Sequence, residues 1–189
     1  MHHQCAAVLM VAALLSAATP TAAQDIEERV KLCATCHGDN GLPKLPESPI
    51  IWGQHEGYLY IEMRDFKTGA RKSDIMQPIV ADMDKTEMLA LAAYFSKLPW
   101  PETGYQSTDA DKKAGERIAT SGMCTQCHLG GFLGDGTIPR IGGQTETYLH
   151  KDLLDFKTRA RANNPDKSTL LASYSDEDLA AMARYLAGF

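Results

Sequence analysis

The pentapeptide Cys-x-x-Cys-His occurs twice in this chain of 189 residues, at 33–37 and at 124–128. The sequences that follow the two copies also match, at an interval of 90 or 91 residues. The matching segments are 49–54 with 139–144, Tyr58-Leu59 with Tyr148-Leu149, 66–68 with 156–158, and 93–95 with 184–186. A unit of about 80 residues is therefore present in two copies, which are too few for a solenoid. We predict two similar domains in tandem.

Both units have the apolar spacing of helices. Met88, Leu91, Ala92 and Phe95 lie at positions i, i+3, i+4 and i+7, and the equivalent residues at 179–186 repeat this spacing. Asp84 with Glu87, and Ser175 with Asp178, are expected to cap these two helices. Further helices are expected near 25–35, 55–67, 110–123 and 145–158. Since no segment alternates as a strand does, the predicted fold class is all-α.

Two changes in composition divide the chain. Prolines and a glycine between Pro99 and Gly104 end a helix and begin a linker. Residues 1–23 contain no Lys, Arg, Asp or Glu and have an apolar centre too short to span a bilayer. We interpret 1–23 as a cleaved signal peptide that takes Cys5 with it, and a retained anchor helix is the alternative. The expected product is periplasmic, with domains at 24–103 and 104–189.

The Cys-x-x-Cys-His motif indicates the group that each domain contains. Cys-x-x-Cys alone also fits a zinc site or a redox disulfide, but the adjacent histidine is typical of covalent c-type haem. The two thiols bond to the haem vinyl groups and the imidazole binds the iron. We therefore predict two covalently bound haem c groups. The attachment residues are Cys33, Cys36, Cys124 and Cys127, and the iron-binding histidines are His37 and His128.

Size and charge agree with this interpretation. A domain of about 80 residues rarely stabilises itself by its apolar core alone, and a haem would fill that core. The chain carries 19 Lys and Arg against 24 Asp and Glu, a net charge of −5. This balance is unlike that of a basic nucleic-acid-binding protein, and it favours a docking partner with a basic patch.

The motifs and the repeated segments resemble those of dihaem cytochromes of the cytochrome c4 type. The resemblance covers residues 25–189 and implies two cytochrome c domains that transfer electrons. It also implies that the carbonyl groups of Pro49 and Pro139 steady the haem-binding histidines. It places the second axial ligand of haem 1 at Met76, which follows a loop and has no methionine counterpart in the second copy.

The second copy departs from the family at this position, because residues 162–170 contain no methionine. Three interpretations of the sixth position of haem 2 stay open. In the first, a neutral Lys167 amine binds the iron. In the second, His150 binds it, and in the third the position is open or occupied by water. Lys167 as an ordinary solvated lysine is the alternative role for that residue.

Several other residues have less specific roles. Met63, Met83, Met88, Met123 and Met182 are expected in the apolar core, and Trp52 is expected either there or over haem 1. Arg71 and Arg161 recur in the repeat and would pair with haem propionates or lie in solvent. His55, which has no histidine counterpart in the second copy, is expected at the surface.

Two functions are compatible with these residues. The first is single-electron transfer between a protein donor and a protein acceptor, either as a free carrier or docked to a membrane respiratory complex or a dehydrogenase subunit. The second is a dihaem oxidoreductase or peroxidase that binds its substrate at haem 2. Ligand access to haem 2 distinguishes the two functions.

Overall fold

The computed structural model describes residues 22–189, and its regular secondary structure is helical. Among them no strand forms, and Asp135 and Ile138 make an isolated β-bridge. The helices are α1 Ala22–His37, α2 Glu56–Thr68, α3 Met76–Val80, α4 Lys85–Ser96, α5 Asp109–Ser121, α6 Thr125–His128, the 3₁₀ helix η1 Gly130–Phe132, α7 Glu146–Thr158, α8 Pro165–Leu171 and α9 Asp176–Ala187. The predicted all-α class is confirmed.

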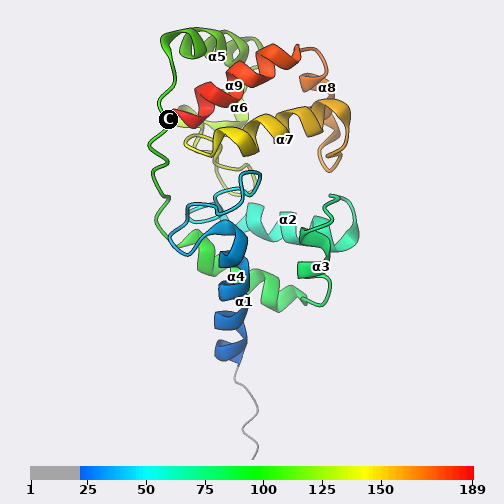
Figure 1. The fold of residues 1–189 in the computed structure, drawn as a ribbon. Coiled ribbons are helices and arrows are strands. Elements are labelled where there is room, and N and C mark those ends of the chain that lie inside the picture. Colours follow the sequence, from blue (N-terminus) through cyan, green and yellow to red (C-terminus); the bar gives the residue numbers. More distant parts are fainter. Residues whose placement is uncertain (1–21) are drawn as a thin grey trace, which may run out of the picture.

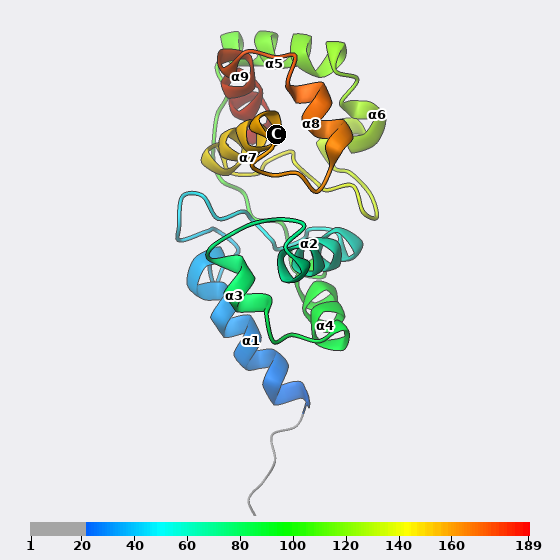
Figure 2. The ribbon, with the colours of Figure 1, turned by 90° about the vertical axis from the view of Figure 1, so that its right-hand side faces the viewer.

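The helices form two stacked bundles (Figure 1). The first bundle contains α1–α4 and the second contains α5–α9, and residues 97–108 run along one side to join them. In both views α2 of the first bundle faces α7 of the second (Figure 2). Within residues 22–189, no helix has the combination of length and apolar sequence that a membrane crossing needs.

Each bundle has its own apolar core. The core of the first bundle includes Val80, Met83 and Met88 with the apolar face of α4, and Trp52 packs against its edge. The core of the second bundle includes Phe156, Leu179 and Met182. The helical spacing seen in the sequence therefore identified the buried faces of α4 and α9 correctly.

The expectation for Met123 was wrong, because its side chain is 59% exposed. In the first bundle α1 continues through the motif to His37, whereas α5 ends at Ser121 and α6 begins only at Thr125. Met123 lies in this break with φ of 50°, so the chain has already left the helix that would have buried it. The repeat predicts which residues correspond but not that the helix is interrupted in one copy.

The two predicted capping boxes are present. Asp84 accepts a hydrogen bond from the main-chain N–H of Glu87 at 2.9 Å, and the Glu87 carboxylate accepts one from Asp84 N–H at 2.9 Å. Ser175 and Asp178 make the equivalent pair at the start of α9. These bonds satisfy main-chain donors that a helix leaves free at its first turn.

Replacing Asp84 with alanine is expected to lower the free energy of unfolding by about 1 kcal/mol, because it removes this cap. Urea unfolding of the holoprotein measures the change. The neighbouring exposed Lys85→Ala serves as the control, with an effect within about 0.5 kcal/mol. Equal effects of the two substitutions would show that the cap contributes nothing.

Buried ionic groups join the two bundles. Arg71 donates to the Glu62 carboxylate of its own bundle at 2.7 Å, and across the interface to Tyr148 Oη at 3.2 Å and Asp152 at 3.4 Å. The side chain of Arg71 is 13% exposed, and those of Glu62 and Asp152 are 11% and 12% exposed. Coulombic attraction is stronger here than at a surface because little water screens it.

Arg161 makes the reciprocal set of contacts from the second bundle. It donates to Asp152 of its own bundle at 2.6 Å, and across the interface to Glu62 and to Tyr58 Oη. Its side chain is only 6% exposed. The alternative that places the two arginines in solvent is therefore wrong. In this structure both of them contact carboxylates of both bundles.

His55 is also part of this interface. Its Nε2 lies 2.8 Å from the carbonyl oxygen of Leu133 in the second bundle, within hydrogen-bond distance. His55 is half-buried and this bond lies in an exposed region, so the residue stays at the surface as expected, but its partner lies 78 positions away in the sequence. The sequence around His55 does not reveal a partner so far away along the chain.

Candidate haem sites

The two motif histidines are held in the same way. His37 Nδ1 lies 2.8 Å from the carbonyl oxygen of Pro49, and His128 Nδ1 lies 3.0 Å from that of Pro139. A carbonyl only accepts, so each ring donates its Nδ1–H and keeps the lone pair on Nε2. Each imidazole therefore has the tautomer that binds iron, with a second partner that orients the ring.

Both rings are neutral at pH 7. Burial lowers the pKa of His37, although its bond to Pro49 opposes the change. Burial and the nearby positive charge of Lys167 lower the pKa of His128 to about 4. A protonated imidazole has no lone pair for a metal, so these environments keep both histidines available as ligands.

The four motif cysteines form no disulfide. Burial raises the pKa of Cys33 to about 11 and also raises that of Cys124. A redox or nucleophilic cysteine has a depressed pKa, so these two thiols lack that character. Within residues 22–189, no group of three or more His, Cys, Asp or Glu side chains is arranged to hold a metal ion, as a zinc ribbon would need.

Met76 is the first residue of α3, after an exposed loop. Its main-chain N–H donates to Ser73 Oγ at 3.1 Å, which fixes the start of the helix. Met76 and Cys33 pack against the same apolar core cluster of the first bundle. The structure thus brings the candidate axial methionine to the core that the first motif also borders.

Lys167 is on α8 and turns its amine into the second bundle. Its Nζ lies 4.1 Å from the centre of the Phe156 ring and 3.9 Å from Asp152 Oδ2. Burial lowers the pKa of Lys167 to about 8, although Asp152 opposes this. The amine is near enough to His128 and Cys124 for its charge to lower the pKa of both. Lys167 is therefore not the solvated lysine of the alternative interpretation. His150, the other candidate ligand of haem 2, is half-buried on α7.

Large apolar side chains flank the candidate haem residues on the polypeptide surface. Leu32 precedes Cys33, Ile75 precedes Met76, and Leu129 follows His128; they are 39%, 60% and 44% exposed. Exposed apolar side chains favour contact with another apolar surface. Together with the neutral histidines and the cysteines beside them, these side chains fit a covalent porphyrin in each bundle.

Comparison with known proteins agrees with this chemistry. The family model described as "Cytochrome C oxidase, cbb3-type, subunit III" matches residues 110–186. A protein named cytochrome c4 from Pseudomonas aeruginosa is 31% identical over 175 residues, which cover 86% of this chain and 86% of the relative. The chain belongs to the cytochrome c4 family. As a cytochrome c of this family, it binds haem c covalently.

Two further comparisons extend this assignment. A thiosulfate dehydrogenase electron acceptor from Stutzerimonas stutzeri is 32% identical to this cytochrome over 167 residues, 82% of this chain and 77% of the relative. The crystal structure of reduced cytochrome c4 from Pseudomonas stutzeri superimposes with a TM-score of 0.78 at 29% identity, over 88% of this chain and 97% of that one. The predicted architecture of two cytochrome c domains is confirmed.

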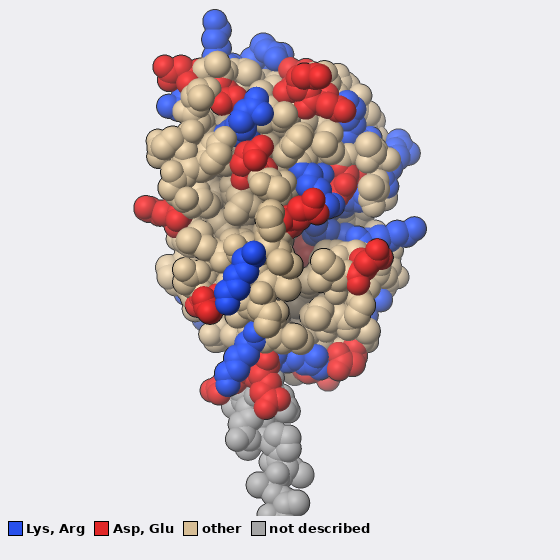
Figure 3. Space-filling view, in the orientation of Figure 1, with Lys and Arg blue, Asp and Glu red and all other residues tan. Residues whose placement is uncertain are grey.

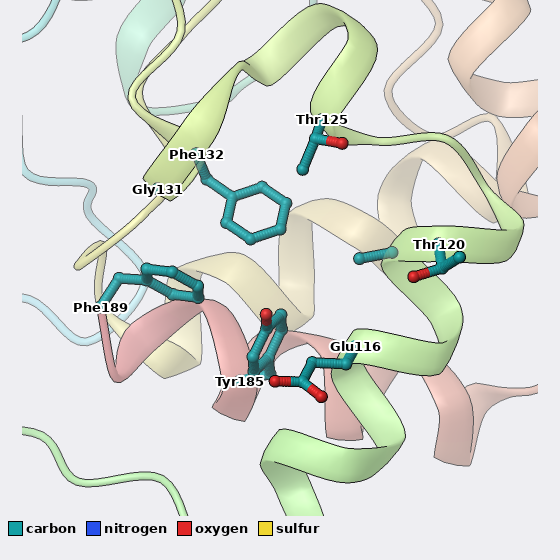
Figure 4. A pocket seen from close by; sticks show the side chains of 8 residues that line it. Glu116, Thr120, Thr125, Gly131, Phe132, Tyr185 and Phe189 are labelled. Carbon is teal, nitrogen blue, oxygen red and sulfur yellow. The ribbon is translucent and has the colours of Figure 1, made fainter.

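A shallow pocket of this cytochrome borders the second haem-attachment motif, because Thr125 is one of its lining residues (Figure 4). It has a volume of about 230 Å³ and is lined by residues of α5, α6, η1 and α9 and by Phe189. Phe132, Tyr185 and Phe189 meet edge to face around it, with ring centres 5.0–5.8 Å apart.

Proposed function

We propose that this chain is a periplasmic dihaem cytochrome that carries single electrons between redox proteins. Haem 1 would be held by Cys33, Cys36, His37 and Met76. Haem 2 would be held by Cys124, Cys127 and His128, with Lys167 as the sixth ligand. The observation that carries the proposal is the equivalent bond of each motif histidine to a proline carbonyl, at 2.8 Å and 3.0 Å.

Haem, when bound, supplies a one-electron couple at each site. The chain's own residues set the conditions for it. The proline carbonyls orient the imidazole rings and leave each Nε2 free to bind iron, and a thioether such as that of Met76 would favour a closed centre of raised potential. The apolar cores limit the entry of water, which keeps the change in solvation small during electron transfer.

The donor or acceptor is proposed to be another redox protein. One relative is named as the electron acceptor of thiosulfate dehydrogenase, which supports a dehydrogenase as the donor. The face in Figure 3 carries both signs of charge intermixed, with uncharged side chains between them. The proposed domain boundaries are 24–103 and 104–189. The proposed signal peptide, 1–23, lies almost wholly outside the described residues, and Cys5 with it.

Two measurements on the purified holoprotein test this function. The pyridine adduct is expected to give two haems per chain, and a redox titration is expected to take up two electrons in one-electron steps. Electron transfer from a reduced dehydrogenase to the oxidised cytochrome is then followed by stopped-flow absorbance. A haem count other than two, or no exchange with any protein donor, would contradict the proposal.

Lys167→Ala is expected to open haem 2 to carbon monoxide. In the wild-type protein the amine must lose its proton to bind iron, and its pKa of about 8 means that rising pH favours ligation. Carbon monoxide binding to the reduced wild-type protein should therefore weaken as the pH rises toward about 8 and level off above it. In Lys167→Ala one haem per chain should bind it at every pH, because the competing amine is absent.

Lys151→Ala, on the exposed side of α7, is the control and should behave like the wild type. If wild-type haem 2 binds carbon monoxide readily at alkaline pH, Lys167 is not its ligand. Peroxide turnover would then test the oxidoreductase alternative at the same haem.

A further inference from the structure

Gln54 and Gln144 make reciprocal contacts across the interface between the bundles. Each residue ends its copy of the repeated segment 49–54 or 139–144, just before α2 or α7, and each is 3% exposed. The sequence shows that the two glutamines correspond, but their role becomes visible only when the two bundles are placed together.

Gln144 binds the main chain of Ile50 with both atoms of its carboxamide. Its Oε1 accepts from Ile50 N–H at 2.8 Å, and its Nε2 donates to the Ile50 carbonyl oxygen at 3.0 Å. Oε1 also accepts from Thr145 N–H at 2.9 Å. Two N–H donors converge on one atom, which fixes that atom as the oxygen.

Gln54 makes the same contacts in the opposite direction. Its Oε1 accepts from Arg140 N–H at 2.9 Å and its Nε2 donates to the Arg140 carbonyl oxygen at 2.8 Å. Oε1 also accepts from His55 N–H at 3.0 Å. Each glutamine thus binds the residue that follows a histidine-steadying proline in the other bundle.

The bonded N–H and the proline carbonyl belong to a single peptide group. Ile50 N–H and Pro49 C=O are its two ends, and the same holds for Arg140 N–H and Pro139 C=O. Resonance couples the ends of a planar peptide, so an acceptor at the N–H increases the negative charge on the oxygen. The Pro49 oxygen, which accepts from His37 at 2.8 Å, therefore becomes a stronger acceptor when Gln144 is present.

We propose that Gln144 and Gln54 are positioning residues that set the reduction potential of the haem in the opposite bundle. Gln144 acts on haem 1 through the Pro49–Ile50 peptide and His37, and Gln54 acts on haem 2 through the Pro139–Arg140 peptide and His128. This inference rests on the proposed haem ligation. A stronger acceptor at Nδ1–H makes the imidazole a stronger donor, which stabilises the ferric iron and lowers the potential.

The test compares the holoproteins of Gln144→Leu and Gln54→Leu by spectroelectrochemical titration. The charge-transfer band of a ferric iron bonded to a thioether identifies haem 1. Gln144→Leu is expected to favour reduction of haem 1 by about threefold, which is about 30 mV at 59 mV per decade, with haem 2 unchanged. Gln54→Leu is expected to favour reduction of haem 2 by a similar factor, with haem 1 unchanged.

Each variant is the matched control for the other, because a general loosening of the interface would move both haems alike. The exchange rate of the ring Nδ1–H with solvent, measured by NMR on the reduced protein, gives a second readout. It is expected to rise only for His37 in Gln144→Leu and only for His128 in Gln54→Leu. If Gln144→Leu does not load haem, Gln144→Asn withdraws the same amide by one methylene and should give a smaller shift in the same direction.

Three results would overturn the inference. They are a shift only at the haem in the same bundle as the substituted glutamine, equal shifts at both haems, and unchanged potentials in a protein that holds two haems. A wild-type haem count other than two would instead overturn the proposed function. The two failures are therefore distinguishable.

Discussion

Replacing Arg161 with leucine is expected to lower the free energy of unfolding by about 3–5 kcal/mol, because it leaves buried carboxylates with too few partners. Glu62 and Asp152 are 11% and 12% exposed, and both lose a close guanidinium contact. Arg71 still contacts both carboxylates, but at 3.4 Å from Asp152. An effect at the lower end of that range is therefore expected.

Urea unfolding of the holoprotein measures this loss. Arg117→Leu is the control, because Arg117 also pairs with a carboxylate, that of Asp178 at 2.7 Å, but its side chain is 63% exposed. Exposed ion pairs contribute about 0–1 kcal/mol, so this control should change little. Equal losses in the two variants would show that burial of the interface charges adds nothing.

The pH dependence of stability gives an independent check. Burial would raise the pKa of Asp152, but Arg161, Lys167 and Arg71 more than offset this and lower it to about 2. A carboxylate with a depressed folded-state pKa adds stability above its unfolded pKa of about 3.9, and this stability is lost as the pH falls toward 2. In Arg161→Leu this contribution should shrink, so the variant should lose less of its own stability over the same acid range.

Replacing both Cys124 and Cys127 with alanine is expected to reduce the covalent haem content from two per chain to one. The remaining haem should keep the ferric thioether band, since Met76 lies in the first bundle. The second bundle should also be destabilised, because a bundle of this size depends on the group that fills its centre. The pyridine adduct, the visible spectrum and denaturant unfolding measure the three effects.

The matched variant is Cys33→Ala with Cys36→Ala. It should also retain one haem, but the ferric thioether band should disappear with haem 1. Retention of two covalent haems by either variant would rule out the proposed attachment. Retention of the thioether band after loss of haem 1 would rule out Met76 as its ligand.

The sequence predicts the local structure of this protein well, because local chemistry determines it. The spacing of Leu179 and Met182 fixes the buried face of α9, and the Asp84 cap fixes the start of α4. The bond between His37 and Pro49 follows from the resemblance, since it joins residues within one domain.

Contacts between the bundles could not be predicted in the same way. The partner of His55 lies 78 positions away, and the cross-interface partners of Arg161 lie 99 and 103 positions away. Nothing in the pattern around Arg161 distinguishes a buried arginine from a solvated one. The repeat does provide one signal for the interface residues. Gln54 recurs as Gln144, and Arg71 recurs as Arg161, at equivalent positions of the two copies.

The reciprocal contacts of the interface have the form of an isologous association, in which each subunit offers the other the same patch. Gln54 binds Arg140 as Gln144 binds Ile50, and Arg71 contacts Asp152 as Arg161 contacts Glu62. In these contacts the interface resembles that of a homodimer, although both halves belong to one chain. Residues 97–108 hold the partners at an effective concentration on the order of millimolar. Docking of the two bundles thus does not depend on how dilute the protein is.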